Sequence, residues 1–328
     1  MNILMKILFM GTPDFAVPSL KALIENDYEV VGVVTQTDRP KGRGHILQAP
    51  PVKEYAKRHN IPVLQPERLS KEPEMINKIA QLNPDLIVTC AFGQILPQSL
   101  LDIPKYGTIN VHGSLLPKYR GAAPIQWAII NGDKKTGITT MFTELGLDTG
   151  DILLKDEVNI DLDMTAGELH DIMSELGAKT LIKTIKALED GTLKRTKQDE
   201  SQATYAQKID KKTGIIDWSQ PSLAIHNRIR GTNPWPGAQS TMCGKRFKIC
   251  CSQMAEIPES LYEKINNPDI MPGTILELVS CNMWVKTGDG ALLIREIQAE
   301  SCKRMTPQQY ACGHELKPGM ILGECEKE

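Results

Sequence analysis

The chain has 328 residues, more than a single hydrophobic core usually supports, so its length predicts two domains. Hydrophobic residues make up 41% of the chain and charged residues 24%, which is ordinary for a soluble globular protein. The formal net charge of -2 does not itself predict a polyanionic partner, so any such prediction has to rest on local charge.

The opening segment, MNILMKILFMG, predicts a buried strand over residues 6–10 rather than a signal peptide. Lys6 interrupts the apolar run, and no small-residue cleavage site follows it. The strand is complete whether translation begins at Met1 or at Met5. Elsewhere no apolar run approaches the roughly 20 residues that cross a bilayer, so we expect no membrane-spanning helix.

The cysteines are scattered, and none of the eight belongs to a C-x-x-C pair. Zinc and iron–sulfur sites usually draw their ligands from such pairs, so we expect no metal site. Unpaired cysteines at irregular spacing are typical of reduced thiols in the cytoplasm, where disulfides rarely persist.

Short apolar runs alternate with helical patterns through the first half of the chain. KILFM, VPSLKALIEN and EVVGVVTQ predict a strand, a helix and a strand; IPVL, MINKIAQL and DLIVTCAF repeat the theme, and GTINVH predicts a further strand. This alternation predicts an α/β domain with a Rossmann-like parallel sheet covered by helices. Ligands in such sheets bind at the carboxyl ends of the strands.

The second half begins with a predicted strand over 151–158 and a long helix. Thr165 and Glu168 form a capping-box pattern at the start of that helix, which runs through Leu188. Residues 191–208 are polar without an apolar period, whereas the runs RFKICCS, GTILELV, MWVKTG and ALLIREIQ predict a small β-barrel. We therefore expect a catalytic domain over 1–190, a linker over 191–208 and a second domain over 209–328.

Asn110 and His112 are the strongest candidates for chemistry. Alternate residues of a strand project from the same face, so both side chains would leave the carboxyl end of GTINVH together. Histidine can exchange protons at neutral pH, and an asparagine amide can donate a hydrogen bond to a developing oxyanion. No Ser or Cys lies in a nucleophile-elbow pattern, so the pair suggests acyl-group chemistry without a covalent intermediate.

Asp148 is the third candidate, in the loop Gly146-Leu147-Asp148-Thr149-Gly150-Asp151. The flanking glycines predict a sharp bend, from which an aspartate could orient the histidine and stabilise its protonated form. On spacing alone the alternatives remain open, because a single histidine is more often structural and such a loop is more often a plain turn.

The segment NVHGSLLPKYRGAAPIQWAI resembles the signature of the folate-dependent formyltransferases, and LGLDTGDIL resembles its partner loop. The resemblance is greatest to the branch of that family that formylates the methionine carried by initiator tRNA. It extends over both halves of the chain, through FMGTPDFAVPSL, TQTDRPKGRG, QDESQATYAQKI, IDWSQP and IRGTNPWPGA. It implies an OB-like fold for the second domain.

The resemblance also implies roles for individual residues. The catalytic asparagine, histidine and aspartate of the family correspond to Asn110, His112 and Asp148. The donor would be 10-formyltetrahydrofolate and the acceptor initiator methionyl-tRNA. Folate would be bound by the loop that runs up to Asp148 and by two further segments, which are Ser114, Leu115, Leu116 and Pro117, and Phe92, Gly93, Ile95 and Leu96 within Phe92–Pro97.

Two basic segments are candidates for binding RNA, because phosphate contacts supply affinity that does not depend on sequence. Residues 36–58 carry six Lys or Arg against two acids, and residues 208–250 carry eight against two. In the family the first segment lies beside the acceptor stem. The candidate residues are Arg39, Lys41 and Arg43 in the first segment and Lys208, Lys211, Lys212, Lys245, Arg246 and Lys248 in the second.

Three other functions fit the sequence less well. A formyltransferase of nucleotide sugars would not need the basic loop or the second domain. A nicotinamide-dependent dehydrogenase would carry a G-x-G-x-x-G fingerprint, which the first strand–helix turn lacks. A catalytically silent RNA-binding protein would not need Asn110, His112 and Asp148 together. The resemblance implies a bacterial-type cytoplasm, where translation starts with formylmethionine.

Overall fold

The computed structural model describes residues 5–41 and 46–323, apart from the side chains of Lys41 and Ile46. The chain divides into two compact units. The first unit comprises Met1–Pro124, Lys135–Val158 and His170–Ala206, and the second comprises Ile125–Lys134, Asn159–Leu169 and Gln207–Glu328.

The first unit is built on a seven-stranded sheet with the order β10-β9-β7-β6-β1-β2-β5. Its strands are β1 (Lys6–Gly11), β2 (Glu29–Val34), β5 (Val63–Leu64), β6 (Leu86–Cys90), β7 (Thr108–His112), β9 (Lys135–Phe142) and β10 (Ile152–Asn159). The pairings β5-β2, β2-β1, β1-β6 and β6-β7 are parallel, whereas β7 and β9 are antiparallel. The predicted α/β fold with a mostly parallel sheet is confirmed.

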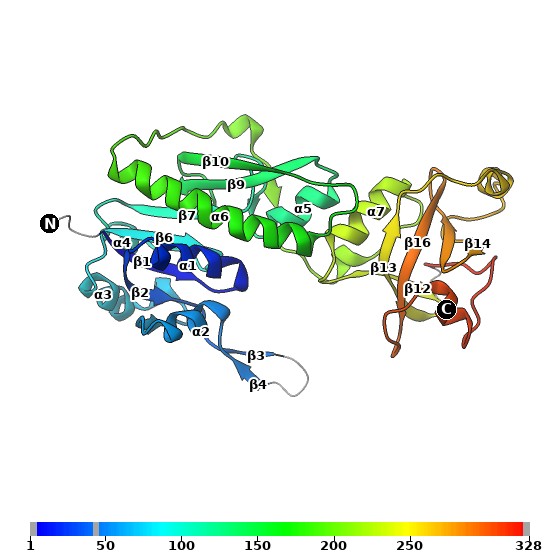
Figure 1. The fold of residues 1–328 in the computed structure, drawn as a ribbon, viewed down its shortest axis with the longest axis horizontal. Coiled ribbons are helices and arrows are strands. Elements are labelled where there is room, and N and C mark those ends of the chain that lie inside the picture. The colour runs from blue at the N-terminus through cyan, green and yellow to red at the C-terminus, as the bar shows by residue number, and fades with distance from the viewer. Residues whose placement is uncertain (1–4, 42–45, 324–328) are drawn as a thin grey trace. The chain divides into compact units, whose positions relative to one another are not determined.

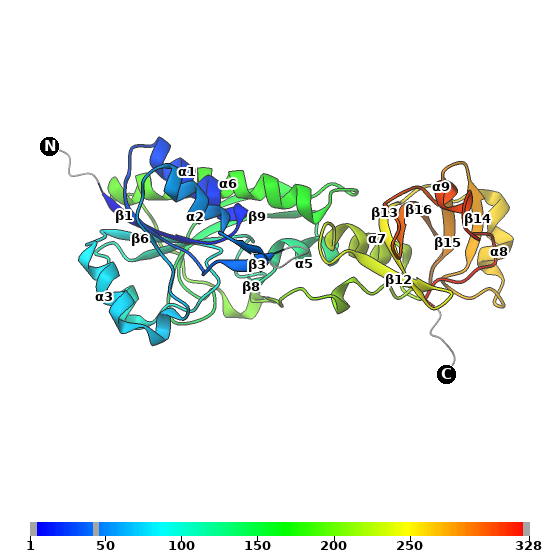
Figure 2. The ribbon, with the colours of Figure 1, turned by 90° about the horizontal axis from the view of Figure 1, so that it is seen from below.

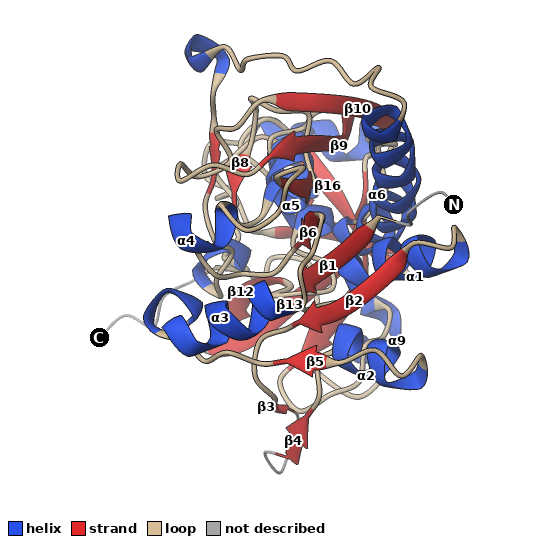
Figure 3. Ribbon diagram, turned by 90° about the vertical axis from the view of Figure 1, so that its left-hand side faces the viewer, coloured by secondary structure: helices blue, strands red, loops and turns tan. Residues whose placement is uncertain are grey.

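Helices cover both faces of this sheet, as Figure 3 shows, with α1 and α6 on one side and α3 and α4 on the other. The helices of this unit are α1 (Val17–Glu25), α2 (Pro51–Arg58), α3 (Pro73–Gln81), α4 (Gln98–Leu101) and α6 (Ala166–Glu189) from His170 onward, whereas α5 (Pro124–Ile130) belongs to the second unit from Ile125 onward. A strand covered on both faces has no reason to alternate apolar and polar residues. All five residues of β6 are accordingly buried, which explains the continuous apolar run LIVTC.

The helix α6 begins as its sequence predicts. The main-chain N–H of Thr165 donates to Glu168 Oε2 at 2.8 Å, and the N–H of Glu168 donates to Thr165 Oγ1 at 3.2 Å. These reciprocal bonds form the capping box, which provides partners for N–H groups that a helix start otherwise leaves unpaired. The N–H and the hydroxyl of Thr165 both donate to the Glu168 carboxyl and hold its pKa below the usual value.

A short hairpin, formed by β3 (Arg39–Lys41) and β4 (Ile46–Gln48), projects below α2 in Figure 1 and beyond the β5 edge of the sheet in Figure 3. Its base is braced by Lys53, whose Nζ lies 2.7 Å from Asp38 Oδ1 and 2.6 Å from Gln65 Oε1. Hydrogen bonds from Gln65 and Lys53 hold the pKa of the Asp38 carboxyl below its usual value. The basic segment is therefore anchored firmly at its first residues.

The second unit contains a five-stranded sheet with the order β12-β13-β16-β15-β14, in which every pairing is antiparallel (Figure 2). Its elements are α7 (Ser222–Gly231), β12 (Ala238–Met242), β13 (Lys245–Gln253), α8 (Tyr262–Asn266), β14 (Ile275–Val279), β15 (Asn282–Lys286), β16 (Ala291–Ala299) and α9 (Pro307–Ala311). The core gathers Phe247, Ile249, Val285 and Ile294 from the strands and Tyr310 from α9. The prediction of a second, small β domain is confirmed, and its sheet is antiparallel with five strands.

Within residues 5–41 and 46–323, no helix is both long and apolar enough to cross a membrane. Over the same residues, His, Cys, Asp and Glu side chains nowhere gather in a group of three or more that could hold a metal ion.

Candidate active site

Strand β7 carries Asn110 and His112 near its carboxyl end, as the sequence predicts. Asn110 is half-buried and His112 is buried. The hydroxyl of Thr89, on the neighbouring strand β6, donates to Asn110 Oδ1 at 3.0 Å. That bond fixes the amide, so Asn110 Nδ2 is the end that faces the rest of the site, 3.5 Å from Asp148 Oδ1. The amide is therefore oriented as a donor.

The contacts of His112 determine which ring nitrogen carries its proton in the neutral form. His112 Nε2 lies 2.9 Å from the main-chain carbonyl oxygen of Tyr119. A carbonyl can only accept, so Nε2 must donate. The lone pair of neutral His112 is then on Nδ1, which lies 3.7 Å from Asp148 Oδ2. A proton taken up on Nδ1 would place the positive ring beside the Asp148 carboxylate.

Asp148 reaches the site through an unusual backbone conformation. Its φ of 53° lies in the left-handed region, which aspartate tolerates better than most residues do. The N–H of Gly121 donates to Asp148 Oδ2 at 2.7 Å and fixes the carboxylate. At Gly150 a Cβ would lie 1.8 Å from the carbonyl oxygen of Phe142, so no side chain fits there. The bend expected from the glycines of this loop is present.

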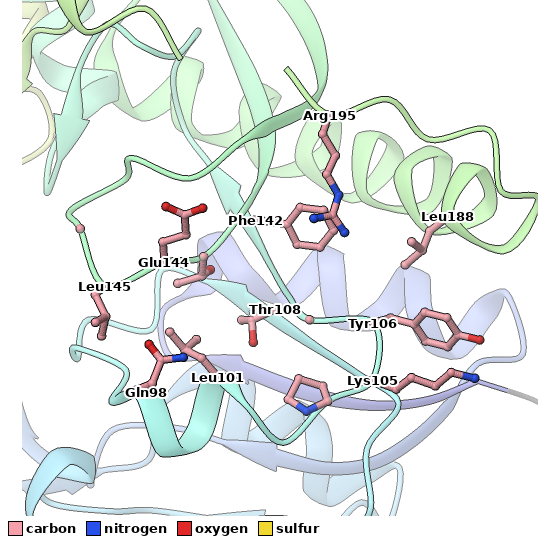
Figure 4. Close-up of a pocket in the computed structure, with 14 residues that line it drawn as sticks. Gln98, Leu101, Lys105, Tyr106, Thr108, Phe142, Glu144, Leu145, Leu188 and Arg195 are labelled. Atoms are coloured by element: carbon pink, nitrogen blue, oxygen red, sulfur yellow. The ribbon is translucent and has the colours of Figure 1, made fainter. Parts of the chain in front are cut away.

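A cavity of about 690 Å³ lies beside the same loop (Figure 4). Thr108 and Thr143 are among its lining residues, and their hydroxyls are buried beneath the surface without a hydrogen-bond partner. The guanidinium of Arg195 stacks on the ring of Phe142, 4.1 Å from its centroid. Thr108, two residues before Asn110, lines the cavity at the amino end of β7, whereas Asn110, His112 and Asp148 are not among its lining residues. The volume is within the usual range for a site that binds a small molecule.

The structure places the expected folate residues in two different environments. Ile95 is 80% exposed, and Gly93 is also exposed, on the loop that follows β6. Phe92 and Leu96 instead pack into a core cluster with Leu8 and Ile87. An apolar side chain as exposed as Ile95 is available to a ligand, whereas the two buried residues shape the loop from below.

The segment after His112 is turned largely into the protein. Ser114 is fully buried and donates its hydroxyl to the carbonyl of Lys118 at 2.6 Å. Leu116 is also fully buried and packs against Met141. Leu115 and Pro117 are partly exposed. Direct contact with a ligand is therefore easier for Leu115 and Pro117 than for Ser114 and Leu116.

The basic residues expected to bind RNA are at the surface wherever the structure describes them. In the first unit Arg39 is exposed on β3, whereas the side chain of Lys41 and all of Arg43 lie outside the described residues. In the second unit Gln239 of β12 pairs with Lys248 of β13, and its amide donates to the carbonyl of Lys211 at 3.2 Å. The segment at 211 therefore lies beside the β12–β13 edge. Lys248 is partly exposed, and the fully exposed residues are Lys208, Lys211, Lys212, Lys245 and Arg246.

Sequence reasoning did not identify several residues of the site. Thr108 and Thr143 line the cavity, and Gly121 supplies the N–H that holds Asp148. The position of Thr108, two residues before Asn110 in a strand, was a signal that could have revealed it. The contact of Gly121 depends on tertiary packing, and no local pattern in the sequence indicates it.

Comparison with known proteins agrees with the fold and site in defining a formyltransferase. Residues 5–185 match the formyl transferase family model, and residues 208–315 match the model of the formyl transferase C-terminal domain. The fold resembles that of the N-formyltransferase from Helicobacter canadensis, which was solved with folinic acid and dTDP-3-aminofucose. The TM-score is 0.66 at 21% sequence identity, and the match covers 89% of this chain and 98% of that one. It also resembles HypX from Aquifex aeolicus in complex with tetrahydrofolic acid, with a TM-score of 0.59, 19% identity and coverage of 94% of this chain and 47% of that one.

Closer relatives specify the family. The methionyl-tRNA formyltransferase of Acetivibrio thermocellus is 52% identical over 98% of this chain and 100% of its own length. That of Clostridioides difficile is 50% identical over 97% of this chain and 100% of its own length. The chain belongs to the methionyl-tRNA formyltransferase family.

Proposed function

We propose that Asn110, His112 and Asp148 catalyse the reaction of this formyltransferase, in which the formyl group of 10-formyltetrahydrofolate passes to the amino group of methionyl-initiator tRNA to give N-formylmethionyl-tRNA. The observation that carries the proposal is the convergence of the three side chains, with Asp148 3.5 Å from Asn110 Nδ2 and 3.7 Å from His112 Nδ1. The nearly full-length relatives at about half identity support the choice of acceptor.

The direct test supplies labelled 10-formyltetrahydrofolate together with charged initiator tRNA, and with free methionine as the control acceptor. We expect label on the methionine of the tRNA and none on free methionine. Label on a nucleotide sugar amine but not on tRNA would contradict the acceptor assignment, and the fold alone does not exclude that outcome because sugar formyltransferases share it.

The geometry assigns a step to each side chain. As the amine attacks the formyl carbon, negative charge develops on the formyl oxygen, and the oriented N–H of Asn110 Nδ2 can stabilise it. The unprotonated Nδ1 of His112 can take the proton that the amine loses. Asp148 stabilises the resulting imidazolium, and the N–H of Gly121 keeps its carboxylate in place. The bond between the formyl carbon and N10 of the folate then breaks, the imidazolium returns its proton to N10, and tetrahydrofolate leaves with the neutral His112 restored.

We propose that the folate substrate extends from these residues into the cavity beside the loop 142–146. Phe142 and Leu101 line the cavity and offer apolar contact to a ring system. Exposed Ile95, on the loop after β6, would add apolar contact near the entrance.

Filling the cavity is expected to weaken the use of folate alone. In Leu101→Trp a larger ring would occupy part of the space, so the KM for 10-formyltetrahydrofolate should rise by roughly tenfold or more, while the KM for tRNA should stay near its wild-type value. Leu82→Trp is the matched control, because Leu82 packs partly buried on the same core cluster and does not line the cavity. Equal KM values for folate in the two variants would contradict the cavity assignment.

We propose that the basic segment on the β3–β4 hairpin positions the aminoacylated end of the tRNA. Arg43→Ala should then lower productive use of tRNA while leaving folate binding unchanged, because this segment lies outside the proposed folate residues. The measurement is formylation at increasing tRNA concentration, together with folate affinity. Normal formylation at every tRNA concentration would remove Arg43 from the site.

We propose further that the exposed basic residues of the second unit hold the body of the tRNA. A variant with Lys211, Lys212 and Lys245 changed to alanine should bind tRNA more weakly and flatten the dependence of log affinity on log salt, by about one unit of slope for each tRNA phosphate that the variant no longer neutralises. In the control variant, three exposed lysines of the first unit are changed to alanine, namely Lys71, Lys78 and Lys179. An unchanged salt slope in the variant of the second unit would contradict the proposal.

We also propose that the chain consists of a catalytic domain over 1–190, a connecting segment over 191–208 and an RNA-binding domain over 209–328. The two family models end and begin close to these limits, at residues 185 and 208. A protein that prepares initiator tRNA works where translation begins, so we propose the cytoplasm as its location.

A further inference from the structure

Arg120 is a charged residue without solvent-exposed surface. Its side chain is completely buried, and it precedes Gly121, whose N–H holds the carboxylate of Asp148. The guanidinium makes two bonds to Glu200, from Nη1 at 2.8 Å and from Nη2 at 2.7 Å. Glu200 is largely exposed, yet this bidentate pair fixes the plane of the guanidinium. A buried charge is costly unless it is fully partnered, so this orientation is strongly specified.

Two further donors of that guanidinium are directed at Gln198. Arg120 Nε and Nη2 lie 3.1 Å and 2.8 Å from Gln198 Oε1. Arginine can only donate, so the oxygen of the Gln198 amide must face it, and the amide nitrogen must face the opposite way. Arg120 therefore determines the direction in which buried Gln198 presents its N–H groups.

Those N–H groups reach the backbone of the Asp148 loop. Gln198 Nε2 donates to the carbonyl oxygens of Asp148 and Gly150, each at 2.8 Å. Asp148 has a left-handed backbone conformation, and Gly150 lies so close to the carbonyl of Phe142 that a side chain would not fit there. Both carbonyls lie in a loop with no regular secondary structure. The amide of Gln198 therefore supplies the hydrogen-bond donors that a sheet or helix would otherwise give them.

We propose that Gln198 is a positioning residue for catalysis, which holds the Asp148 loop in its working conformation and is itself oriented by Arg120. The inference rests on the proposed role of Asp148. It assigns a task to the segment 196–206, which sequence alone presents as a polar connection between domains. The bonds converge on Asp148 from two directions, with Gly121 at its side chain and Gln198 at its main chain.

Two substitutions separate the role of Gln198 from simple packing. Gln198→Glu keeps the shape of the side chain and a partner for Arg120, but turns an acceptor towards two carbonyl oxygens. Gln198→Met also keeps the approximate shape, leaves Arg120 with Glu200, and removes the donor without adding charge. Gln81→Glu is the control for the charge change, because Gln81 is exposed at the end of α3.

The expected kinetic result is a fall in kcat of roughly 10–100-fold in both Gln198 variants, as for a catalytic group displaced by a fraction of an ångström. The KM values for folate and for tRNA should stay within about threefold of wild type, since the residues that bind the substrates are not changed. Melting temperature is measured in parallel to show that each variant is folded.

A direct readout of the loop comes from the Gly121 amide. With carbonyl-¹³C arginine and ¹⁵N glycine, only Arg–Gly peptide groups give a filtered signal, and the chain contains three of them: Arg43–Gly44, Arg120–Gly121 and Arg230–Gly231. A short hydrogen bond to a carboxylate moves an amide proton downfield. In both Gln198 variants the Gly121 proton should therefore move upfield, while the other two signals stay in place.

The outcomes for the positioning role and for Asp148 itself are distinguishable. Folded Gln198 variants with wild-type kcat, or with lowered kcat and an unmoved Gly121 signal, overturn the positioning role. A displaced Gly121 signal with normal turnover shows that Gln198 holds the loop but that the placement of Asp148 does not govern the rate. In that case the proposed role of Asp148 fails together with the inference.

Discussion

Replacing His112 by alanine is expected to lower kcat by roughly 10²–10³-fold or more, the range associated with loss of a proton-transfer group. The ring is held by the Tyr119 carbonyl on one side and faces Asp148 on the other, so no neighbouring residue can take over Nδ1. Asn110→Ala should cause a loss of similar size, because it removes the one amide that Thr89 orients as a donor.

Single-turnover rates with both substrates bound would measure these losses without interference from binding. His59→Ala and Asn77→Ala are suitable controls, because both residues are exposed in the first unit, His59 at the C-cap of α2 and Asn77 on α3. If either His112→Ala or Asn110→Ala turns over at a nearly normal rate, that residue has no part in the chemistry.

The second large effect is expected from Asp148→Asn, which should keep the fold and lose most of the activity. An amide occupies the same space but cannot stabilise a charged imidazole. It also cannot satisfy its neighbours. If its oxygen accepts from Gly121, its nitrogen faces the donor Nδ2 of Asn110; if it is flipped, its nitrogen faces the N–H of Gly121. Two donors face each other in either orientation.

Measurement of kcat across pH, with melting temperature recorded alongside, tests this coupling. Asp27→Asn provides a close control, because Asp27 also has a left-handed backbone, with φ of 61°, but is exposed in a turn. Were Asp148→Asn to show the rate and the pH profile of the wild-type enzyme, Asp148 and His112 would not act together.

Much of the site could be predicted because it depends on local rules. The alternation of side chains along a strand is sufficient to bring Asn110 and His112 to one face, and the glycines of the 146–151 loop are sufficient to indicate a bend. The capping box at Thr165 and Glu168 is equally local, and it forms as expected. In each case the physical cause lies within a few residues of sequence.

The residues that were missed depend on contacts between distant parts of the chain. Gln198 lies fifty positions from Asp148 along the chain, in a polar run whose composition is typical of a linker. Arg120 is charged and would be expected at the surface, yet it is completely buried, and its donors find partners in Gln198, Glu200 and Tyr205. Polarity predicts exposure only where no partner is supplied from elsewhere in the fold.

The antiparallel pairing of β7 with β9 limits where members of this family can gain or lose residues. His112 is paired with Thr139 and Ile109 with Phe142, so one register ties both strands together just before the chain turns towards Asp148. Deleting a residue within β9 would transfer its side chains to the opposite face of the sheet, and the core would be disrupted. The exposed stretch 144–147 can gain or lose a residue at far lower cost. Natural insertions and deletions should therefore accumulate in that stretch and be absent from the strand.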